Sequence, residues 1–178
     1  MGRGVSRAAL IALPVVAAML GVAASRLGAV RAQLSRLGPS WENLHPEVKR
    51  RALAVLREAN RVFNPRGLWV GVFEGWRTEA RQRQVMQRGT SGVRDWRYSY
   101  HPWGLAVDFV FLDRLGRWTW DRPRSDWDEL GRIIEAQGFE WGGRWRSFDG
   151  PHAQLPLLKP SQLIAEYGAP DLYLESIA

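Results

Sequence analysis

The alternation of apolar and polar residues predicts helices interspersed with short strands. Across residues 46–63, apolar side chains recur at helical spacing and fall on one face. Residues 68–74 and 105–112 are apolar runs rich in β-forming residues, which is typical of strands. Three more helices are expected at 78–88, 125–137 and 161–167. Three more strands are expected at 117–120, 139–141 and 152–155. The pattern therefore predicts an α+β fold, in which a small antiparallel sheet is flanked by helices.

Local signals mark where these helices begin and end. Thr78 and Ser125 are residue types that cap helix N-termini, and we expect each to cap the helix that follows it. Gly138 is expected to end the second of these helices. His45 precedes Pro46 at a predicted helix start, which makes this histidine a poor candidate for chemistry.

The first 25 residues form a separate segment by composition. Residues 8–24 are an uncharged run of 17 residues between flanking arginines. This length is at the lower limit for crossing a bilayer, and above the usual core of a signal peptide. We interpret residues 1–25 as an apolar helix that serves as a membrane anchor or a cleaved signal segment, with a buried soluble helix as the alternative. Residues 26–40 are expected to be a linker or a helical extension, and residues 41–178 a folded domain.

The net charge of +7 lies mostly in the N-terminal segment. The first 36 residues contain no acid and five of the chain's basic residues, Arg3, Arg7, Arg26, Arg31 and Arg36. Since the remaining chain carries only +2, the folded domain lacks the excess of basic residues that nucleic-acid binding usually requires. Positive charge around an apolar segment indicates a membrane surface instead. The absence of cysteine excludes disulfides.

Candidate metal ligands are few, because the chain has three histidines and no cysteine. With His45 set aside, His101 and His152 remain. Asp108 interrupts the apolar run 105–112, and a carboxylate inside a buried strand needs a cation or several hydrogen-bond donors. Catalytic zinc typically has three histidine or carboxylate ligands and leaves a fourth position for water. From these residues alone, two alternatives to a metal site remain. Asp108 could be a buried acid held by hydrogen bonds, and His152 could be a strand histidine whose ring nitrogens are hydrogen-bonded within the fold.

A second carboxylate precedes the last histidine. Asp149 and His152 are separated by Gly150 and Pro151, which allow the tight turn that both side chains need to face one ion. A carboxylate that does not bind the metal can accept a proton from the attacking water and pass it to the leaving group.

These stretches resemble a known family. Ser99-x-His101-x-x-Gly104-x-Ala106-x-Asp108 is similar to the SxHxxGxAxD signature of zinc peptidases that cut bacterial cell-wall peptides. These are the VanY/VanX-like D-alanyl-D-alanine carboxypeptidases and dipeptidases, and the L-alanyl-D-glutamate endopeptidases of phage endolysins. Residues 138–152 resemble the family's GFxWGG…W…F…DxPH ending, and 44–48 and 75–82 resemble its upstream elements.

The resemblance implies a role for each candidate residue. Residues 41–178 would be a zinc peptidase domain with a hedgehog/D,D-peptidase-like fold, and its Zn²⁺ ligands would be His101, Asp108 and His152. Asp149 would act as general base and then as general acid. Arg77 would hold the substrate carbonyl or its developing negative charge, whereas Ser99 and Gln82 would bind substrate or support the site. The family usually has an aromatic residue after the second histidine, where this chain has Ala153, so one wall of the substrate pocket is expected to differ.

The function that the resemblance implies is degradation of peptidoglycan by hydrolysis of the L-alanyl-D-glutamate bond in stem peptides. The alternatives are a D,D-carboxypeptidase that trims terminal D-alanine, and an inactive, membrane-tethered wall-binding protein. Expected partners are the stem peptide and, through residues 8–24, the inner membrane; nucleic acid is not expected, and the protein is expected to be a monomer. The domain would then act on the periplasmic or cell-wall side, initially tethered.

Overall fold

The computed structural model describes residues 34, 37–156 and 158–178, and Leu37–Ala178 forms one compact unit. The predicted anchor or signal segment, 1–25, lies outside the described residues, as does nearly all of the predicted linker before Leu37. Among the helices that the structure does describe, none combines the length and apolar character needed to cross a membrane.

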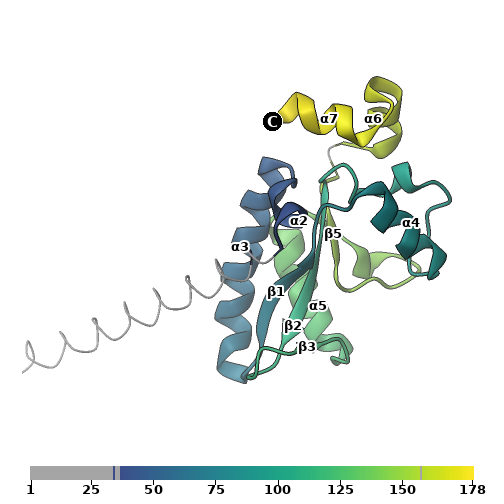
Figure 1. Cartoon of the computed structure of the whole chain (residues 1–178). Coiled ribbons are helices and arrows are strands. Elements are labelled where there is room, and N and C mark those ends of the chain that lie inside the picture. The colour runs from purple at the N-terminus through teal and green to yellow at the C-terminus, as the bar shows by residue number, and fades with distance from the viewer. Residues whose placement is uncertain (1–33, 35–36, 157) are drawn as a thin grey trace, which may run out of the picture. The chain divides into compact units, whose positions relative to one another are not determined.

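The described unit is an α+β fold, which confirms the predicted class (Figure 1). Its helices are α2 (Pro39–Glu42), α3 (Pro46–Phe63), α4 (Glu79–Gln87), α5 (Arg124–Ala136), α6 (Pro160–Tyr167) and α7 (Pro170–Ile177), with short 3₁₀ turns η1 (Asn64–Arg66), η2 (Trp96–Tyr98) and η3 (Gly142–Arg144). Its strands are β1 (Trp69–Glu74), β2 (Ala106–Leu112), β3 (Trp118–Thr119), β4 (Glu140–Trp141) and β5 (His152–Gln154). The strands form one antiparallel sheet in the order β1-β2-β5-β4, and β3 also pairs with β2.

Two local predictions need correction. Ser125 does not cap α5, because the helix begins one residue earlier at Arg124 and has Pro123 as its N-cap. The fixed φ of proline suits the residue before a helix, so the serine falls inside the first turn. The last ten residues, for which no element was predicted, contain the whole of α7, which begins at Pro170.

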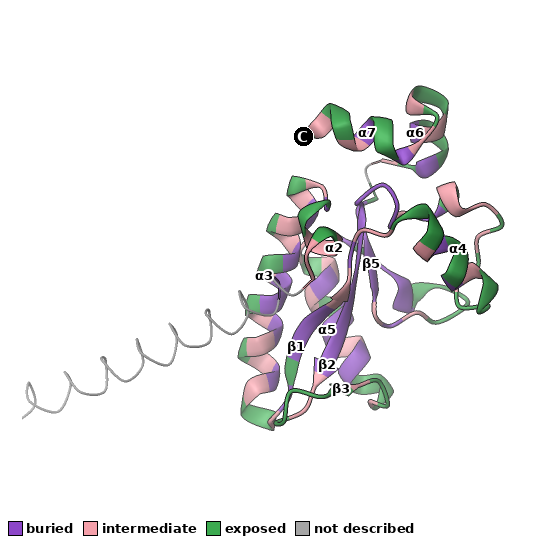
Figure 2. Ribbon diagram, in the orientation of Figure 1, coloured by how far each residue is buried: buried purple, intermediate pink, exposed green. Residues whose placement is uncertain are grey.

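One face of the sheet is covered by α3 and α5. The ring of Phe111 in β2 packs edge to face against Phe63 of α3 at 5.0 Å and against Trp127 of α5 at 4.8 Å. Both phenylalanines are completely buried, and β1 contributes Val70 and Val72 to the same core. Figure 2 colours most of β2, and parts of β1, α3 and α5, as buried.

The opposite face of the sheet carries a different set of side chains. Since side chains alternate along a strand, Asp108, Val110 and Leu112 of β2 point away from the α3–α5 layer. The antiparallel register pairs Asp108 with His152 of β5, and Leu112 with Trp118 of β3. This open face therefore has polar residues toward one end of β2 and aromatic residues toward the other.

Gly104 allows the loop before β2 to approach the start of α3. Its φ is +66°, and a Cβ atom there would lie 2.4 Å from the backbone oxygen of Asn43. The close approach is held by a 2.9 Å hydrogen bond from the His45 N–H to the Gly104 carbonyl. The His45 side chain accepts a hydrogen bond from the Glu47 N–H and so caps α3, which accounts for this histidine without a metal.

Candidate metal centre

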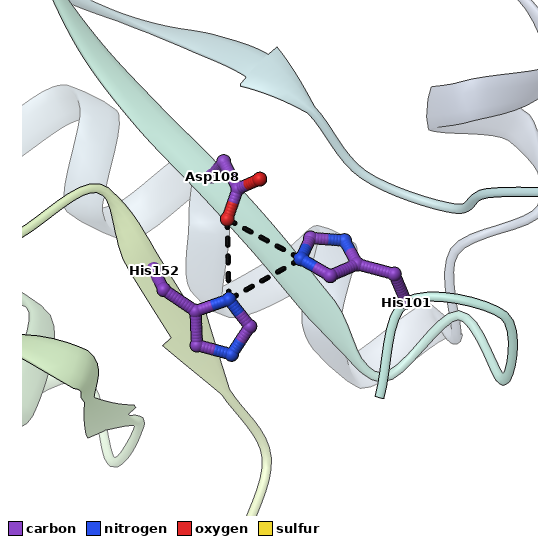
Figure 3. Close-up of side chains that lie close together, drawn as sticks. All are labelled: His101, Asp108 and His152. Atoms are coloured by element: carbon purple, nitrogen blue, oxygen red, sulfur yellow. Dashed lines mark hydrogen bonds and ion pairs between the residues drawn. The ribbon is translucent and has the colours of Figure 1, made fainter. Parts of the chain in front are cut away.

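Three buried side chains from separate segments meet on the open face of the sheet (Figure 3). His101 comes from the loop that follows η2, Asp108 from β2, and His152 from the first position of β5. The pairing of Asp108 with His152 in the antiparallel register places both on the same face. The structure thus brings together the three residues predicted as metal ligands.

The three facing atoms form a nearly equilateral triangle. Nε2 of His101 lies 3.2 Å from Nδ1 of His152 and 3.3 Å from Oδ1 of Asp108, and Nδ1 of His152 lies 3.2 Å from the same oxygen. Two ligand atoms bound to zinc at about 2.0–2.2 Å with a tetrahedral angle are about 3.3–3.6 Å apart. The triangle therefore has the size that a small transition-metal ion requires.

The outer nitrogen of His101 fixes the state of its inner nitrogen. Nδ1 lies 2.6 Å from the backbone carbonyl oxygen of Gly75, which can only accept a hydrogen bond. Nδ1 must therefore carry the proton, and in the neutral ring Nε2 presents a lone pair to Asp108 and His152.

A chain of hydrogen bonds determines which ring nitrogen of His152 carries the proton. The Gln154 amide donates to the Glu140 carboxylate at 3.2 Å, so its Oε1 atom faces Nε2 of His152 at 3.0 Å. Because a carboxylate only accepts, Glu140 determines which way the amide points. Nε2 of His152 must then be the donor, and Nδ1 presents a lone pair inward. Glu140 is held in turn by the Trp145 indole N–H at 2.8 Å.

The donor set fits a divalent metal ion. In the tautomers that Gly75 and Gln154 require, neither inward nitrogen carries a hydrogen, so the two rings cannot form a hydrogen bond with each other across 3.2 Å. Two imidazole lone pairs and one carboxylate oxygen directed at a common point are the ligands that zinc and related ions take. A cation at this point resolves the contact between the two lone pairs.

Arg77 lies directly behind the carboxylate. Its Nη2 donates to the second oxygen of Asp108, its Nε donates to Glu74 at 2.8 Å, and its Nη1 donates to Gln82 at 3.3 Å. Burial alone would raise the pKa of Asp108, but the permanent charge of Arg77 holds that pKa well below its usual range. Asp108 is therefore ionised, as a ligand must be.

The ionisation of the other groups follows from burial and charge. Burial, reinforced by Arg77, lowers the pKa of His101, which favours the neutral ring that can bind a metal. Burial also acts to lower the pKa of His152, but the neighbouring carboxylates of Asp108 and Asp149 together outweigh this effect and raise the pKa. The pKa of Asp149 is raised, chiefly because the carboxyl is largely buried.

Asp149 lies beside the triangle but does not contribute to it. The turn before His152 is closed by a 3.3 Å hydrogen bond from the His152 N–H to the Asp149 carbonyl. Gly142 packs against this turn so closely that a Cβ there would be 2.7 Å from the Asp149 carbonyl oxygen and 3.2 Å from Cβ of His152. The tight turn predicted from Gly150 and Pro151 is therefore present, held against η3.

The other two predicted residues, Gln82 and Ser99, are both buried. Gln82 has no exposed surface and lies between Arg77 and the Ser91 hydroxyl. Ser99 is buried two residues before His101, and its N–H donates to the Trp96 carbonyl at 3.2 Å.

Several supporting residues were missed by sequence reasoning. These are Glu74, Glu140, Trp145 and Gln154, which hold Arg77 and His152. Gln154 carried a usable signal, because it lies two positions after His152 in a predicted strand and so shares its face. Glu140 could be found only from the register that pairs it with Gln154.

Comparison with known proteins places this site in a family. A family model described as D-alanyl-D-alanine carboxypeptidase, of peptidase family M15, matches residues 93–155. The chain is 34% identical over 131 residues to the peptidoglycan L-alanyl-D-glutamate endopeptidase CwlK of Bacillus subtilis, covering 66% of this chain and 76% of that protein. It is 36% identical over 94 residues to the L-alanyl-D-glutamate peptidase of Listeria phage A118, covering 50% of this chain and 31% of the phage protein.

Among solved structures, the Serratia marcescens L-Ala D-Glu endopeptidase ChiX is similar, with 30% identity and a TM-score of 0.47, over 75% of this chain and 92% of that one. The identity and coverage of the Bacillus relative establish the family: the chain belongs to the M15 peptidases. The family match at 93–155 includes His101, Asp108, Asp149 and His152.

Proposed function

We propose that this protein is a zinc-dependent peptidoglycan peptidase that hydrolyses the L-alanyl-D-glutamate bond of cell-wall stem peptides. The observation that carries the proposal is the triangle of His101, Asp108 and His152, whose inward atoms have lone pairs and no hydrogen to share. The choice of bond is supported by the names of the Bacillus and Listeria phage relatives, each of which is called a peptidase of that linkage.

In this proposal His101, Asp108 and His152 hold the zinc ion. Bound zinc acts as a Lewis acid that polarises the peptide carbonyl and makes water a better nucleophile at neutral pH. Asp149 accepts the proton of the attacking water and donates it to the leaving amine of D-glutamate. Its raised pKa suits both transfers, since a carboxyl with a pKa closer to neutrality is a stronger base and still a usable acid.

Arg77 has two tasks in the proposed mechanism. It fixes Asp108 through Nη2, and Glu74 and Gln82 keep its guanidinium plane in position. Three of its five N–H groups have these acceptors in the described part of the chain, so one N–H on each Nη atom can still donate. We assign these to the substrate carbonyl oxygen as it gains negative charge.

The competing function is a D,D-carboxypeptidase, which the description of the matched family model names. The two activities leave different products from the same purified peptidoglycan. Mass spectrometry of a digest should find peptides with new N-terminal D-glutamate, and this product should disappear with a chelator and return with added Zn²⁺. Free D-alanine without new N-terminal D-glutamate would assign the carboxypeptidase activity instead.

Asp149→Ala tests the mechanism separately from the metal. The variant should retain zinc, because Asp149 lies outside the ligand triangle, and should lose hydrolysis by about 10²- to 10⁴-fold, the usual contribution of a general acid–base group. Asp128→Ala, which removes a carboxylate on the exposed surface of α5, is the matched control. Full activity of Asp149→Ala would remove Asp149 from the mechanism.

We further propose that the protein acts as a monomer outside the inner membrane, to which residues 8–24 initially tether it. The support is the uncharged run between Arg7 and Arg26, together with a substrate that lies on the outer side of that membrane. Fractionation of cells that produce the full chain, with and without residues 1–25, tests the tether; recovery of both forms in the same soluble fraction would contradict it.

A further inference from the structure

An exposed group of aromatic side chains occupies the far end of the open sheet face. Phe73 of β1 packs edge to face against both Trp118 and Trp120, with ring centroids 4.8 and 4.9 Å apart. Trp118 is 56% exposed and Trp120 is 42% exposed, although both are among the largest apolar side chains. We call these three residues the aromatic platform. Figure 2 shows the segment around β3 as mainly exposed, in contrast to the buried strands β2 and β5.

The platform is continuous with the metal centre. Trp118 is paired with Leu112, and Leu112 lies on the same face of β2 as Asp108 because they are four residues apart. A β-bulge between Val72 and Glu74 leaves Phe73 and Glu74 both on this face, so that Phe73 contacts the platform while Glu74 contacts Arg77. One strand pair thus joins the two sites.

The two arginines beside the platform are both paired with carboxylates. Arg117 and Arg122 flank the two tryptophans in sequence, and each is paired with an aspartate: Arg117 with Asp113 at 2.7 Å and Arg122 with Asp126 at 2.5 Å. An anionic partner such as a lipid headgroup is better served by unpaired arginines. Two exposed indoles whose flanking arginines are already paired suit a ligand that has no anionic group and has an apolar face of its own.

We propose that the aromatic platform binds the saccharide to which the stem peptide is attached, an assignment that rests on the proposed function. The stem peptide is joined through L-alanine, by way of a lactyl ether, to an N-acetylated amino sugar of the glycan strand. Such a sugar is neutral once its lactyl carboxyl is in amide linkage, and the C–H groups on one face of its ring pack against an indole.

The spacing of the two sites matches this linkage. Along a strand each pair of residues spans about 6.8 Å, so the levels of Val110 and Leu112 lie about 7 and 14 Å from that of Asp108. From the L-alanine carbonyl, one residue and the lactyl group span about 7 Å when extended. A peptide cut beside Asp108 therefore places its first sugar over the nearer part of the platform, at Trp120, and the next sugar toward Trp118.

The test compares two substrates that have the same peptide. One is the disaccharide-linked tetrapeptide, and the other is the tetrapeptide with an acetylated N-terminus. Wild type should cleave the first with a kcat/KM higher on the order of tenfold, the effect of one or two stacked rings. Trp118→Ala/Trp120→Ala should bring this ratio close to one while leaving cleavage of the acetylated peptide unchanged. Leu53→Ala, which removes an exposed apolar side chain on α3, is the control and should keep the wild-type ratio.

Direct binding separates this proposal from the proposed function. A tetrasaccharide of alternating N-acetylglucosamine and amidated N-acetylmuramic acid, titrated into the full-length protein, should perturb indole resonances in wild type and not in the double variant. A further outcome is that neither peptide is cleaved while saccharide binding is still seen and still depends on the two tryptophans. That result would contradict the proposed function and support saccharide binding by the aromatic platform. If the peptides are cleaved with a ratio that the double variant does not change, the saccharide assignment is overturned.

Other occupants of the platform have their own signatures. A second copy of the chain would give a dimer in size-exclusion chromatography that Trp118→Ala/Trp120→Ala dissociates. A lipid surface would give co-sedimentation with phosphatidylglycerol vesicles that the same variant abolishes. Either result, with an unchanged substrate ratio, overturns the saccharide assignment. Thermal melting of the double variant and of Trp118→Phe/Trp120→Phe reports whether each is folded, and the phenylalanine pair should keep part of the preference.

Discussion

Strand β2 contributes side chains to both faces of the sheet, and the two faces are stabilised by different kinds of contact. On the covered face, Phe109 and Phe111 of β2 are completely buried beneath α3 and α5, and their contacts are apolar. On the open face, Asp108 is also buried, but its second carboxylate oxygen accepts a hydrogen bond from Arg77, and its first oxygen faces the two histidines. The covered face is specified by volume, and the open face by donor and acceptor positions.

This difference separates stability from chemistry within a few ångströms. A side chain on the covered face contributes through the area and volume it fills, so its loss should weaken the whole fold. A side chain of the metal centre contributes through one lone pair or one N–H, so its loss should abolish a function while the fold persists. The following changes test how far this separation holds.

The largest effect is expected from Asp108→Ala. Removal of the only carboxylate in the triangle takes away one of three ligands, and hydrolysis should fall by about 10⁴-fold or more as metal is lost. Because α3 and α5 do not contact this side of β2, the folded state should persist. Zinc content, peptidoglycan hydrolysis and circular dichroism measure the three consequences. Asp113→Ala, in the turn beyond β2, is the control; a global unfolding of Asp108→Ala would show that the two faces are not separable.

The reverse change is Phe111→Ala on the covered face. It removes the ring that contacts both Phe63 and Trp127 and should lower the free energy of unfolding by about 3–5 kcal/mol. Urea denaturation at 25 °C measures this loss. Zinc affinity of the folded variant should stay at the wild-type value, since the ring points away from Asp108 and His152. A tenfold loss of affinity would mean that the core sets the positions of the ligands, whereas Phe111→Leu should cost less in stability because it leaves a smaller cavity.

A smaller effect is expected from Gln154→Ala, which acts on the metal through His152. Without the acceptor at Nε2, the imidazole loses the partner that fixes its tautomer, and zinc affinity should fall by about 10- to 100-fold. Competition with a fluorescent zinc chelator measures this directly. Glu140→Gln keeps an acceptor for the Gln154 amide and should retain most of the affinity. Equal affinity of Gln154→Ala and wild type would mean that Asp108 and His101 alone orient the ion.

The covered face was largely predictable from the sequence, because its signals are local. The helical spacing over 46–63 gave α3 with both ends correct, and the apolar run 105–112 gave β2 to within one residue. The open face was predictable only in part. The three candidate ligands followed from residue type and from the resemblance of their motif, and the structure brings them together.

The groups that orient those ligands could not be predicted in the same way. The Gly75 carbonyl that holds His101 belongs to the backbone and leaves no trace in residue type. Glu140 reaches His152 through Gln154 only because β4 and β5 pair in one register, and a register depends on the whole sheet. Ser125 shows the opposite error: a favourable cap residue was present, but the N-cap is Pro123, two positions earlier, and the helix begins at Arg124.

The smallest effect is expected from Thr78→Ala, which tests how far the N-cap of α4 supports the residues behind the metal centre. α4 buries only Gln82 and Val85, so its stability should depend on its N-cap, where the Thr78 hydroxyl accepts a hydrogen bond from the Arg81 N–H at 3.1 Å. Thr78→Ala should therefore cost about 1 kcal/mol, and hydrogen exchange should show the loss in α4 rather than in β2 or α3. Thr78→Ser keeps the acceptor and should show little change. Since Gln82 holds Arg77 from this helix, hydrolysis should fall slightly in Thr78→Ala while zinc content stays the same; a loss of zinc equal to that of Gln154→Ala would mean that α4 positions the ligands as strongly as β5 does.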